Sequence, residues 1–252
     1  MRTSRWWAAA LLGVSLPAGA GGYDATVEWA RKVALASPVS GVVAQVLVEP
    51  GDRVKQGQAL VVLEAVPFQA AVARAQAELR RRKRERLEAL RAWRRAKELY
   101  EAEVLATVEL DQARLALTRA EAELQAAEAG LEEARYRLDR SRLAAPFDAV
   151  VLARRVEVGQ AVAAELSPQV LVVVARAGRY RARFQVPLEA LPALRPGRPA
   201  RVEVGDREYA GVVREVALEP ERTRDGPRYT VGVVFESAEL LRAGTPAEVE
   251  LR

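Results

Sequence analysis

The sequence lacks the two side chains on which enzyme chemistry most often depends. There is no cysteine and no histidine among the 252 residues, and there is a single methionine. These absences exclude disulfides, a lipid-modified cysteine, thiolate or imidazole catalysis, Cys/His zinc sites and a soft-ligand cluster for copper. Carboxylates remain, but no pair of them stands apart from the helical surface as a glycoside hydrolase would require. We therefore expect no enzyme activity, no metal and no cofactor.

The composition is that of a chain that folds. About half of the 252 residues are apolar, and the net charge is +5, carried almost entirely by arginine. A chain of this length can form one or two compact cores without help from disulfides. We expect several modules rather than one.

The first residues form a targeting pattern. Two arginines precede an apolar stretch over residues 6–16, which is followed by proline and small residues up to Ala20. An apolar stretch of about 11 residues fits a secretory signal peptide and falls short of the ~20 that span a bilayer. We predict a signal peptide over residues 1–20 and a mature chain outside the cytoplasm. A short buried helix is the alternative.

The sequence contains one internal repeat. Residues 37–43 match residues 145–151, and the register continues without a gap until Gly51 falls on Gly159. Each copy reads as a strand opened after proline, a glycine turn and a second strand. Two copies of about 30 residues are too small for separate cores, so they are predicted to pair into one β-sandwich.

The segment between the two copies has helical periodicity. Leucine recurs every seventh residue, and alanine follows three places after each of the first four leucines. The seam leucines are Leu110, Leu117, Leu124, Leu131 and Leu138. This pattern predicts a coiled-coil seam in which small residues allow close packing against a partner helix.

The preceding segment is the predicted partner. Apolar residues at 72, 79, 93 and 100 hold one seam position, which Arg82 and Arg86 interrupt. We predict an antiparallel pair of helices over about 67–104 and 107–141, each roughly 50 to 57 Å long.

A basic run at residues 80–86 is compatible with nucleic-acid binding, since a basic helix can neutralise phosphates. Folding the segment about Leu105 and Ala106, however, places residue 83 opposite residue 128. The run would then face a set of glutamates: Glu121, Glu123, Glu128, Glu132 and Glu133. We therefore predict ion pairs within the hairpin or between neighbouring hairpins, and no nucleic-acid partner.

The two repeat copies resemble the halves of a biotinyl/lipoyl-like domain. The first contains Pro-Val-Ser-Gly-Val-Val from Pro38, and the second contains Ala-Pro-Phe-Asp-Ala-Val-Val from Ala145. Carrier domains of that fold present a modified lysine at a tight turn between the halves, whereas here the long helical segment is inserted at that point. A split of this kind is similar to that of the HlyD-like membrane fusion proteins, the periplasmic adaptors of RND and ABC efflux systems.

The end of the helical pair carries a second resemblance. Efflux adaptors of the RND type have at this tip an arginine, a leucine four residues on and a serine seven further, and the motif docks onto the exit duct. Arg95 and Leu99 follow that layout, and Ala106 stands where serine is expected. Serine would cap the second helix and share a capping box with Glu109, so Thr107 is expected to act as the cap instead. The resemblance implies duct docking by Arg95, Leu99 and Thr107; an ordinary coiled-coil turn is the alternative.

Short strands follow the second half, at 180–186, 209–216, 228–235 and 247–251, and predict a small antiparallel barrel. The fold class is α+β and multi-module: a long helical hairpin inserted in a lipoyl-like sandwich, followed by the barrel. The predicted modules are a signal peptide (1–20), an N-terminal strand or linker (21–34), lipoyl-like halves (35–66 and 142–175), a hairpin (67–141) and the barrel (176–252). A membrane-proximal domain is expected to be absent or vestigial.

The resemblance implies a periplasmic adaptor, associated with the inner membrane through its partner. That partner would be an RND or ABC transporter, linked by a homo-oligomeric ring to a TolC-type outer-membrane duct. One alternative is a biotin or lipoate carrier, which is disfavoured because every lysine lies away from the expected turn; these are Lys32, Lys55, Lys83 and Lys97. Another is an envelope coiled-coil scaffold without a role in transport.

Overall fold

A computed structural model describes residues 22–251, with gaps at 165–168 and 224–225. The predicted signal peptide lies outside the described residues. The chain divides into two compact units. The sandwich unit is Lys32–Ala177. The barrel unit consists of two segments: the described residues up to Arg31, and those from Gly178 onward.

The sandwich unit contains two four-stranded sheets. One has the order β2-β9-β7-β4 and the other β6-β5-β3-β8. The strands of the first are β2 (Lys32–Ala36), β9 (Val170–Arg176), β7 (Ala149–Arg154) and β4 (Arg53–Val54). Those of the second are β6 (Arg142–Ala144), β5 (Ala59–Leu63), β3 (Gly41–Val46) and β8 (Ala161–Val162). Their apolar side chains form one core made largely of valine and leucine.

The repeat appears in the structure as a reciprocal pair of hydrogen bonds. The register of the repeat carries β3 onto β7 and β4 onto β8. The Gly51 N–H donates to the Val151 carbonyl at 2.8 Å, and the Gly159 N–H donates to the Val43 carbonyl at 2.8 Å. Both glycines have a positive φ, +101° and +84°, which a side chain would disfavour. The two copies therefore close one sandwich, as predicted.

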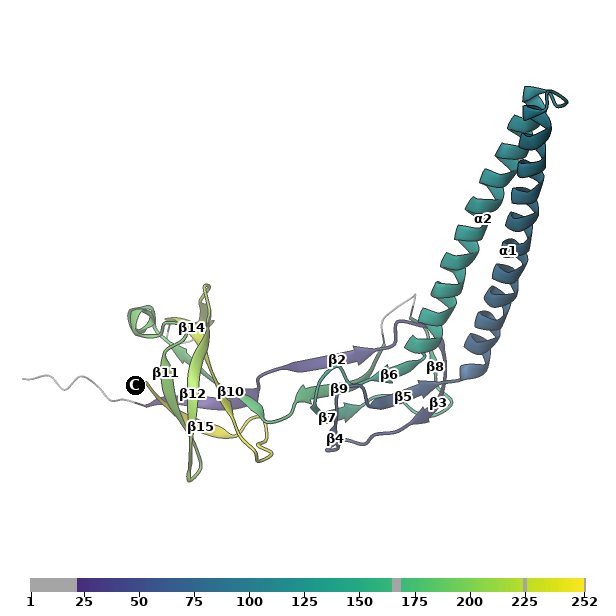
Figure 1. The fold of residues 1–252 in the computed structure, drawn as a ribbon. Coiled ribbons are helices and arrows are strands. Elements are labelled where there is room, and N and C mark those ends of the chain that lie inside the picture. Colours follow the sequence, from purple (N-terminus) through teal and green to yellow (C-terminus); the bar gives the residue numbers. More distant parts are fainter. Residues whose placement is uncertain (1–21, 165–168, 224–225, 252) are drawn as a thin grey trace, which may run out of the picture. The chain divides into compact units, whose positions relative to one another are not determined.

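A long helical hairpin is inserted between β5 and β6. It consists of α1 (Ala65–Glu101) and α2 (Thr107–Arg140), which run side by side to a tight turn (Figure 1). At its base, the Leu63 N–H donates to the Ser141 carbonyl at 2.9 Å, so the chain leaves and re-enters the sandwich at one place. The predicted fold class, a hairpin within a sandwich followed by a barrel, is confirmed.

The barrel unit is a six-stranded antiparallel barrel. Its order is β10-β1-β15-β11-β12-β14, closed by pairing of β14 with β10, and β13 extends β14. The strands are β1 (Tyr23–Trp29), β10 (Arg179–Val186), β11 (Pro199–Val204), β12 (Arg207–Val216), β13 (Glu221–Thr223), β14 (Gly226–Glu236) and β15 (Pro246–Leu251). A 3-10 helix, η1 (Leu188–Ala193), follows β10.

The segment predicted as an N-terminal strand or linker, described from residue 22, contains β1 and the start of β2. Val27 in β1 pairs with Ala182 of β10, and Tyr23 pairs with Val249 of β15, so β1 fills a place in the barrel. The next strand, β2, pairs with β9 in the sandwich. The boundary between the two units therefore falls inside this segment, after Arg31. The reason is that Val27 of β1 is completely buried against barrel residues far along the chain.

Candidate partner-binding hairpin

The seam leucines line the side of α2 that faces α1. Leu131 is 5% exposed, and the other four predicted leucines, Leu110, Leu117, Leu124 and Leu138, are half-buried. Ala134 is buried as well, whereas α1 has no buried residue. A hairpin of two helices has only one seam to bury, so partial exposure is the expected state of most of its apolar residues.

Two arginines of α1 occupy seam positions and bridge the helices. Arg82 forms an ion pair with Glu123, and Arg86 donates to Glu121 at 3.3 Å. The predicted cross-hairpin pairing is thus present, but its register differs from the expected one, which placed residue 83 opposite 128. The shift arises because α1 ends at Glu101, about three residues earlier than predicted.

Of the other three predicted glutamates, two pair within α2, and Glu128 forms no ion pair among the described residues. Glu132 and Glu133 pair with arginines of their own helix, Arg135 and Arg137, each at 2.7 Å. Among the described residues, the basic side chains Arg80, Lys83 and Arg84 form no ion pair. The basic face of α1 is therefore only partly neutralised within the chain.

Glu78 anchors the arginine cluster on α1. It accepts from Arg81 at 2.7 Å and from Arg82 at 2.8 Å. These two hydrogen bonds, of which that from Arg81 has the larger effect, lower the pKa of Glu78 to about 2. The carboxylate is therefore ionised far below neutral pH. The ion pairs that Glu78 forms lie within α1 and are solvated, so each contributes little to stability.

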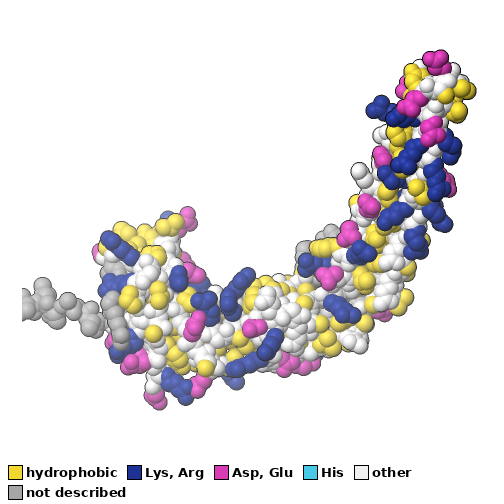
Figure 2. Space-filling model, in the orientation of Figure 1, with side chains coloured by type: hydrophobic (Ala, Val, Ile, Leu, Met, Phe, Trp, Pro, Cys, Tyr) yellow, Lys and Arg dark blue, Asp and Glu magenta, His cyan; other side chains and the backbone are white. Residues whose placement is uncertain are grey.

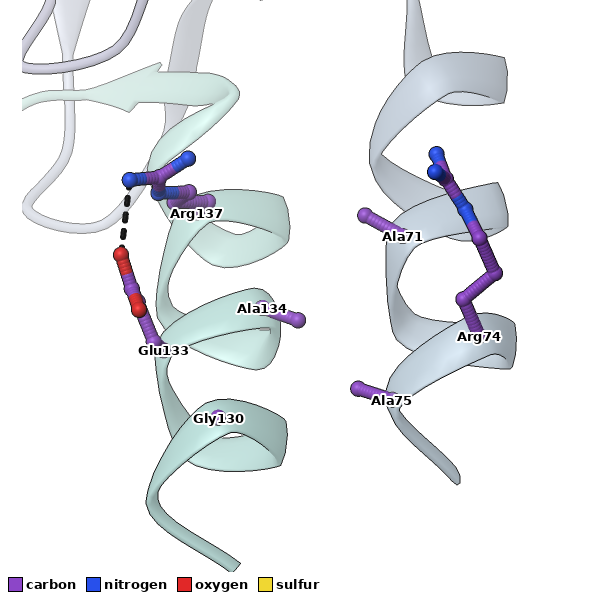
Figure 3. Close-up of a pocket in the computed structure, with 7 residues that line it drawn as sticks. All are labelled: Ala71, Arg74, Ala75, Gly130, Glu133, Ala134 and Arg137. Atoms are coloured by element: carbon purple, nitrogen blue, oxygen red, sulfur yellow. Dashed lines mark hydrogen bonds and ion pairs between the residues drawn. The ribbon is translucent and has the colours of Figure 1, made fainter. Parts of the chain in front are cut away.

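A shallow groove lies between the helices near their base (Figure 3). Ala71 and Ala75 of α1 face Gly130 and Ala134 of α2, and these small side chains leave a space of about 270 Å³. The close-up shows Ala134 pointing toward α1 and the Glu133–Arg137 pair lying to one side. The described side chains that line this groove do not form a convergent set of polar groups that would hold a small molecule.

The turn at the tip ends α1 with a Schellman motif. The Val104 N–H donates to the Leu99 carbonyl, and the Glu103 N–H donates to the Tyr100 carbonyl, both at 2.9 Å. Glu103 has a φ of +59°, in the left-handed region that glycine usually occupies at this position. The turn is thus regular in its hydrogen bonding but built with a residue that prefers another conformation.

The N-cap of α2 is not Thr107, as predicted, but Ala106. The helix begins at Thr107, and the capping position is Ala106, whose side chain has no oxygen to accept a hydrogen bond. Half of a capping box remains, because the Glu109 carboxylate accepts the Ala106 N–H at 3.4 Å. Thr107 is the first helical residue and does not act as the cap.

The tip exposes apolar and charged side chains together. Arg95 and Thr107 are exposed, and Leu99 is 46% exposed. Two further apolar residues, Val104 and Val108, are 73% and 65% exposed there, and Tyr100, which was predicted to lie in the seam, is 39% exposed. Figure 2 shows apolar side chains in yellow beside acidic ones at this end of the hairpin. Apolar residues next to a predicted turn were the signal that could have identified them.

Among the described residues, no cluster of three or more acidic side chains could hold a metal ion. No helix in the same part of the chain is long and apolar enough to cross a membrane.

The architecture defines a class of protein: a lipoyl-like sandwich split by a helical hairpin, which is the barrel-sandwich hybrid. A family model described as CzcB-like, barrel-sandwich hybrid domain, matches residues 31–175. The chain belongs to this CzcB-like family.

Two curated relatives match most of the chain. The multidrug resistance protein MdtA of Escherichia coli O7:K1 is 28% identical over 197 residues, which cover 77% of this chain and 47% of MdtA. The macrolide export protein MacA of Yersinia pestis is 29% identical over 241 residues, covering 88% of this chain and 65% of MacA. The chain therefore spans about half to two thirds of the length of these relatives.

Solved structures share the fold. The membrane fusion protein Spr0693 from Streptococcus pneumoniae R6 superposes with a TM-score of 0.72 at 20% identity, covering 92% of this chain and 98% of that one. A MacA-MexA chimera that contains the Pseudomonas aeruginosa MexA α-hairpin domain gives 0.65 at 20% identity, covering 92% of this chain and 78% of the chimera.

Proposed function

We propose that this chain is a non-catalytic periplasmic adaptor of a tripartite export pump. It would link an inner-membrane transporter, of RND or ABC type, to a TolC-type outer-membrane duct. Support comes from the family, from relatives named for drug resistance and macrolide export, and from a fold shared with a membrane fusion protein. Export of the chain by the N-terminal segment 1–20 is part of the proposal.

The observation that carries the docking role is the tip itself. Arg95 and Leu99 lie four residues apart and so share one face at the end of α1, and both are exposed. A guanidinium there can donate to carbonyl or carboxylate oxygens of a duct while Leu99 enters an apolar groove. Each tip buries little area, so useful affinity requires several tips acting together in an oligomer.

The test is the double variant Arg95→Asp with Leu99→Ser. It should abolish export in a cellular assay and stop the chain from co-purifying with outer-membrane proteins. Thermal stability should change little, because both side chains are exposed in the single chain. A matched control is Arg53→Asp with Leu47→Ser, which makes the same chemical change at exposed sites of the sandwich unit.

Two results would count against the proposal. Export that persists in a folded tip variant would mean that docking lies elsewhere, and the chain would then fit an envelope scaffold better. Unfolding of the variant would assign Arg95 and Leu99 to the hairpin's own packing.

A further inference from the structure

One arginine on the outer face of the barrel unit reaches strands on both sides of its own. Arg181 of β10 donates to Glu28 of β1 at 2.6 Å and to Glu215 of β12 at 2.5 Å. β1 is a neighbour of β10 in the barrel, but β12 lies two strands away, because β14 comes between β10 and β12. The guanidinium therefore crosses β14 and ties β1 to a strand that is not its neighbour.

Two features of the backbone make this crossing possible. A Cβ atom on Gly232 of β14 would lie 2.8 Å from the Arg181 Cδ, so glycine leaves the path of the side chain open. The pairing of β12 with β14 has an irregularity between Val213 and Glu215, and this places Glu215 opposite Gly232. Bulges re-aim side chains, and a glycine inside a strand marks a close approach. Both features serve the same arginine.

Arg183, two residues along β10, extends the contact. It donates to Glu28 at 3.5 Å and to Glu221 of β13 at 2.9 Å, so Glu28 lies between two arginines. Isolated ion pairs at a surface are weak, but connected and partly buried ones are coupled to one another. The side chains of Arg181 and Glu28 are 25% and 31% exposed. Glu28, Arg181, Arg183, Glu215 and Glu221 form the charge network of β1.

The backbone pairing of β1 is incomplete on both sides. β1 pairs with β15 over residues 23–26 and with β10 over residues 26–29, so of its described residues only Thr26 pairs with both strands. By contrast, β10 pairs with β14 along its whole length, residues 179–186. A cleft of about 540 Å³, lined by Asp24 and Gln185 among others, lies where β1 and β10 part. β1 therefore depends on side chains more than its neighbour does.

We propose that the charge network is a latch that controls the local opening of β1. β1 leaves the barrel as a unit before β10, β14 and β12 separate from one another. Glu215 and Gly232 set how often it leaves, although both lie on strands that are not neighbours of β1. Because β1 continues through Ala30 and Arg31 into β2, the latch decides whether that connection starts from a paired strand. This inference goes beyond the proposed function and does not depend on it.

Hydrogen exchange of the mature chain, followed by NMR, tests the latch. The Val27 N–H donates to the Thr245 carbonyl at 2.9 Å, so it is protected while β1 is in place. Val233 in β14, which is paired on both sides, reports the opening of the rest of the barrel. Glu215→Gln should speed exchange at Val27 about threefold and Arg181→Met about tenfold. Exchange at Val233 should not change in either variant.

Glu208→Gln is the matched control. Glu208 is also on β12 and accepts from an outward arginine, Arg201, at 3.2 Å. Its side chain is 57% exposed, compared with 56% for Glu215. The Arg201–Glu208 pair stays within the β11–β12 hairpin, so its loss should leave exchange at Val27 unchanged.

Three results would overturn the proposal. Unchanged exchange at Val27 in Glu215→Gln would mean that the far end of the network does not reach β1. Equal acceleration at Val27 and Val233 would mean that the network adds only general stability. The same acceleration from Glu208→Gln would point to the net charge of the barrel rather than to a latch.

A second set of variants tests the crossing itself. Gly232→Ala should displace Arg181 and speed exchange at Val27 as Arg181→Met does. In a chain that already carries Arg181→Ala, Gly232→Ala should add no further acceleration, because the side chain that needs the space is gone. Additive effects would show that Gly232 acts on the barrel independently of Arg181, which contradicts the role given to it.

Discussion

Ala106 lacks the side-chain oxygen that its position would use. Its backbone is extended, with φ −73° and ψ 150°, and its N–H already donates to Glu109. A serine at this position would accept an N–H from the first turn of α2 and complete the capping box. Ala106→Ser should therefore stabilise the hairpin by about 1 kcal/mol, seen as a higher midpoint of thermal unfolding by far-UV circular dichroism.

Ala102→Ser is the control for that change. It makes the same substitution on the other side of the turn, at the C-cap of α1, where a hydroxyl has no comparable role. Equal effects of the two substitutions, or no effect of Ala106→Ser, would mean that the start of α2 is not limited by its cap.

At the same scale, the sequence identified the unusual alanine but assigned the cap to Thr107. The assignment failed because α2 begins at Thr107 itself, so Ala106 holds the capping position. The end of α1 was also placed about three residues too late, because the Schellman turn there puts Glu103 in a left-handed conformation without a glycine to mark it. Backbone geometry of this kind leaves little trace in residue type.

Leu124 and Leu115 of α2 differ in what they contact, and the same substitution at each distinguishes them. Leu124 is half-buried in the seam, whereas Leu115 is 57% exposed, outside the seam. Leu124→Asp places a charge against α1 and should lower the free energy of unfolding by about 2 to 4 kcal/mol. Leu115→Asp in the isolated chain should change it by less than about 0.5 kcal/mol, the usual range for surface substitutions. Denaturant unfolding at a concentration that keeps the chain monomeric would measure both, and similar losses would mean that the seam is assigned wrongly.

The heptad pattern predicted the existence and direction of both helices, because periodicity is a local property of the sequence. It did not predict their relative register. Arg82 and Arg86 looked like interruptions of the seam, yet they are the residues that bridge it to Glu123 and Glu121. Long side chains can place their charge at the edge of a seam while their methylene groups pack within it.

For the whole molecule, the chain passes twice between its two units, at residues 31–32 and 177–178. β1 precedes the sandwich in the sequence, whereas all other barrel strands follow it. Its residue Val27 is fully buried in the barrel. The internal repeat made the sandwich predictable, since both copies carry the same pattern. β1 was not predictable as a barrel strand, because the whole sandwich and hairpin separate it in sequence from its partners β10 and β15.

This connectivity predicts unequal behaviour of two fragments. Residues 32–177 contain a complete sandwich and hairpin and should unfold cooperatively with a strong helical signal. Residues 178–252 lack β1, so β10 and β15 each lose a partner strand, and this fragment should not give dispersed amide signals by NMR. Joining residues 22–31 to it through a flexible linker should restore them. A folded 178–252 fragment would show that β1 is dispensable.

The hydrogen bond between Leu63 and Ser141 at the base of the hairpin makes the hairpin's length independent of the sandwich. Both legs leave the sandwich at one hydrogen-bonded place, so nothing in the sheets depends on how far the legs extend before they turn. Removing or adding seven residues in each leg would keep every seam side chain in phase and alter the reach by about 10 Å. The length of the hairpin can thus change by whole heptads without any change in the sandwich strands that hold its base.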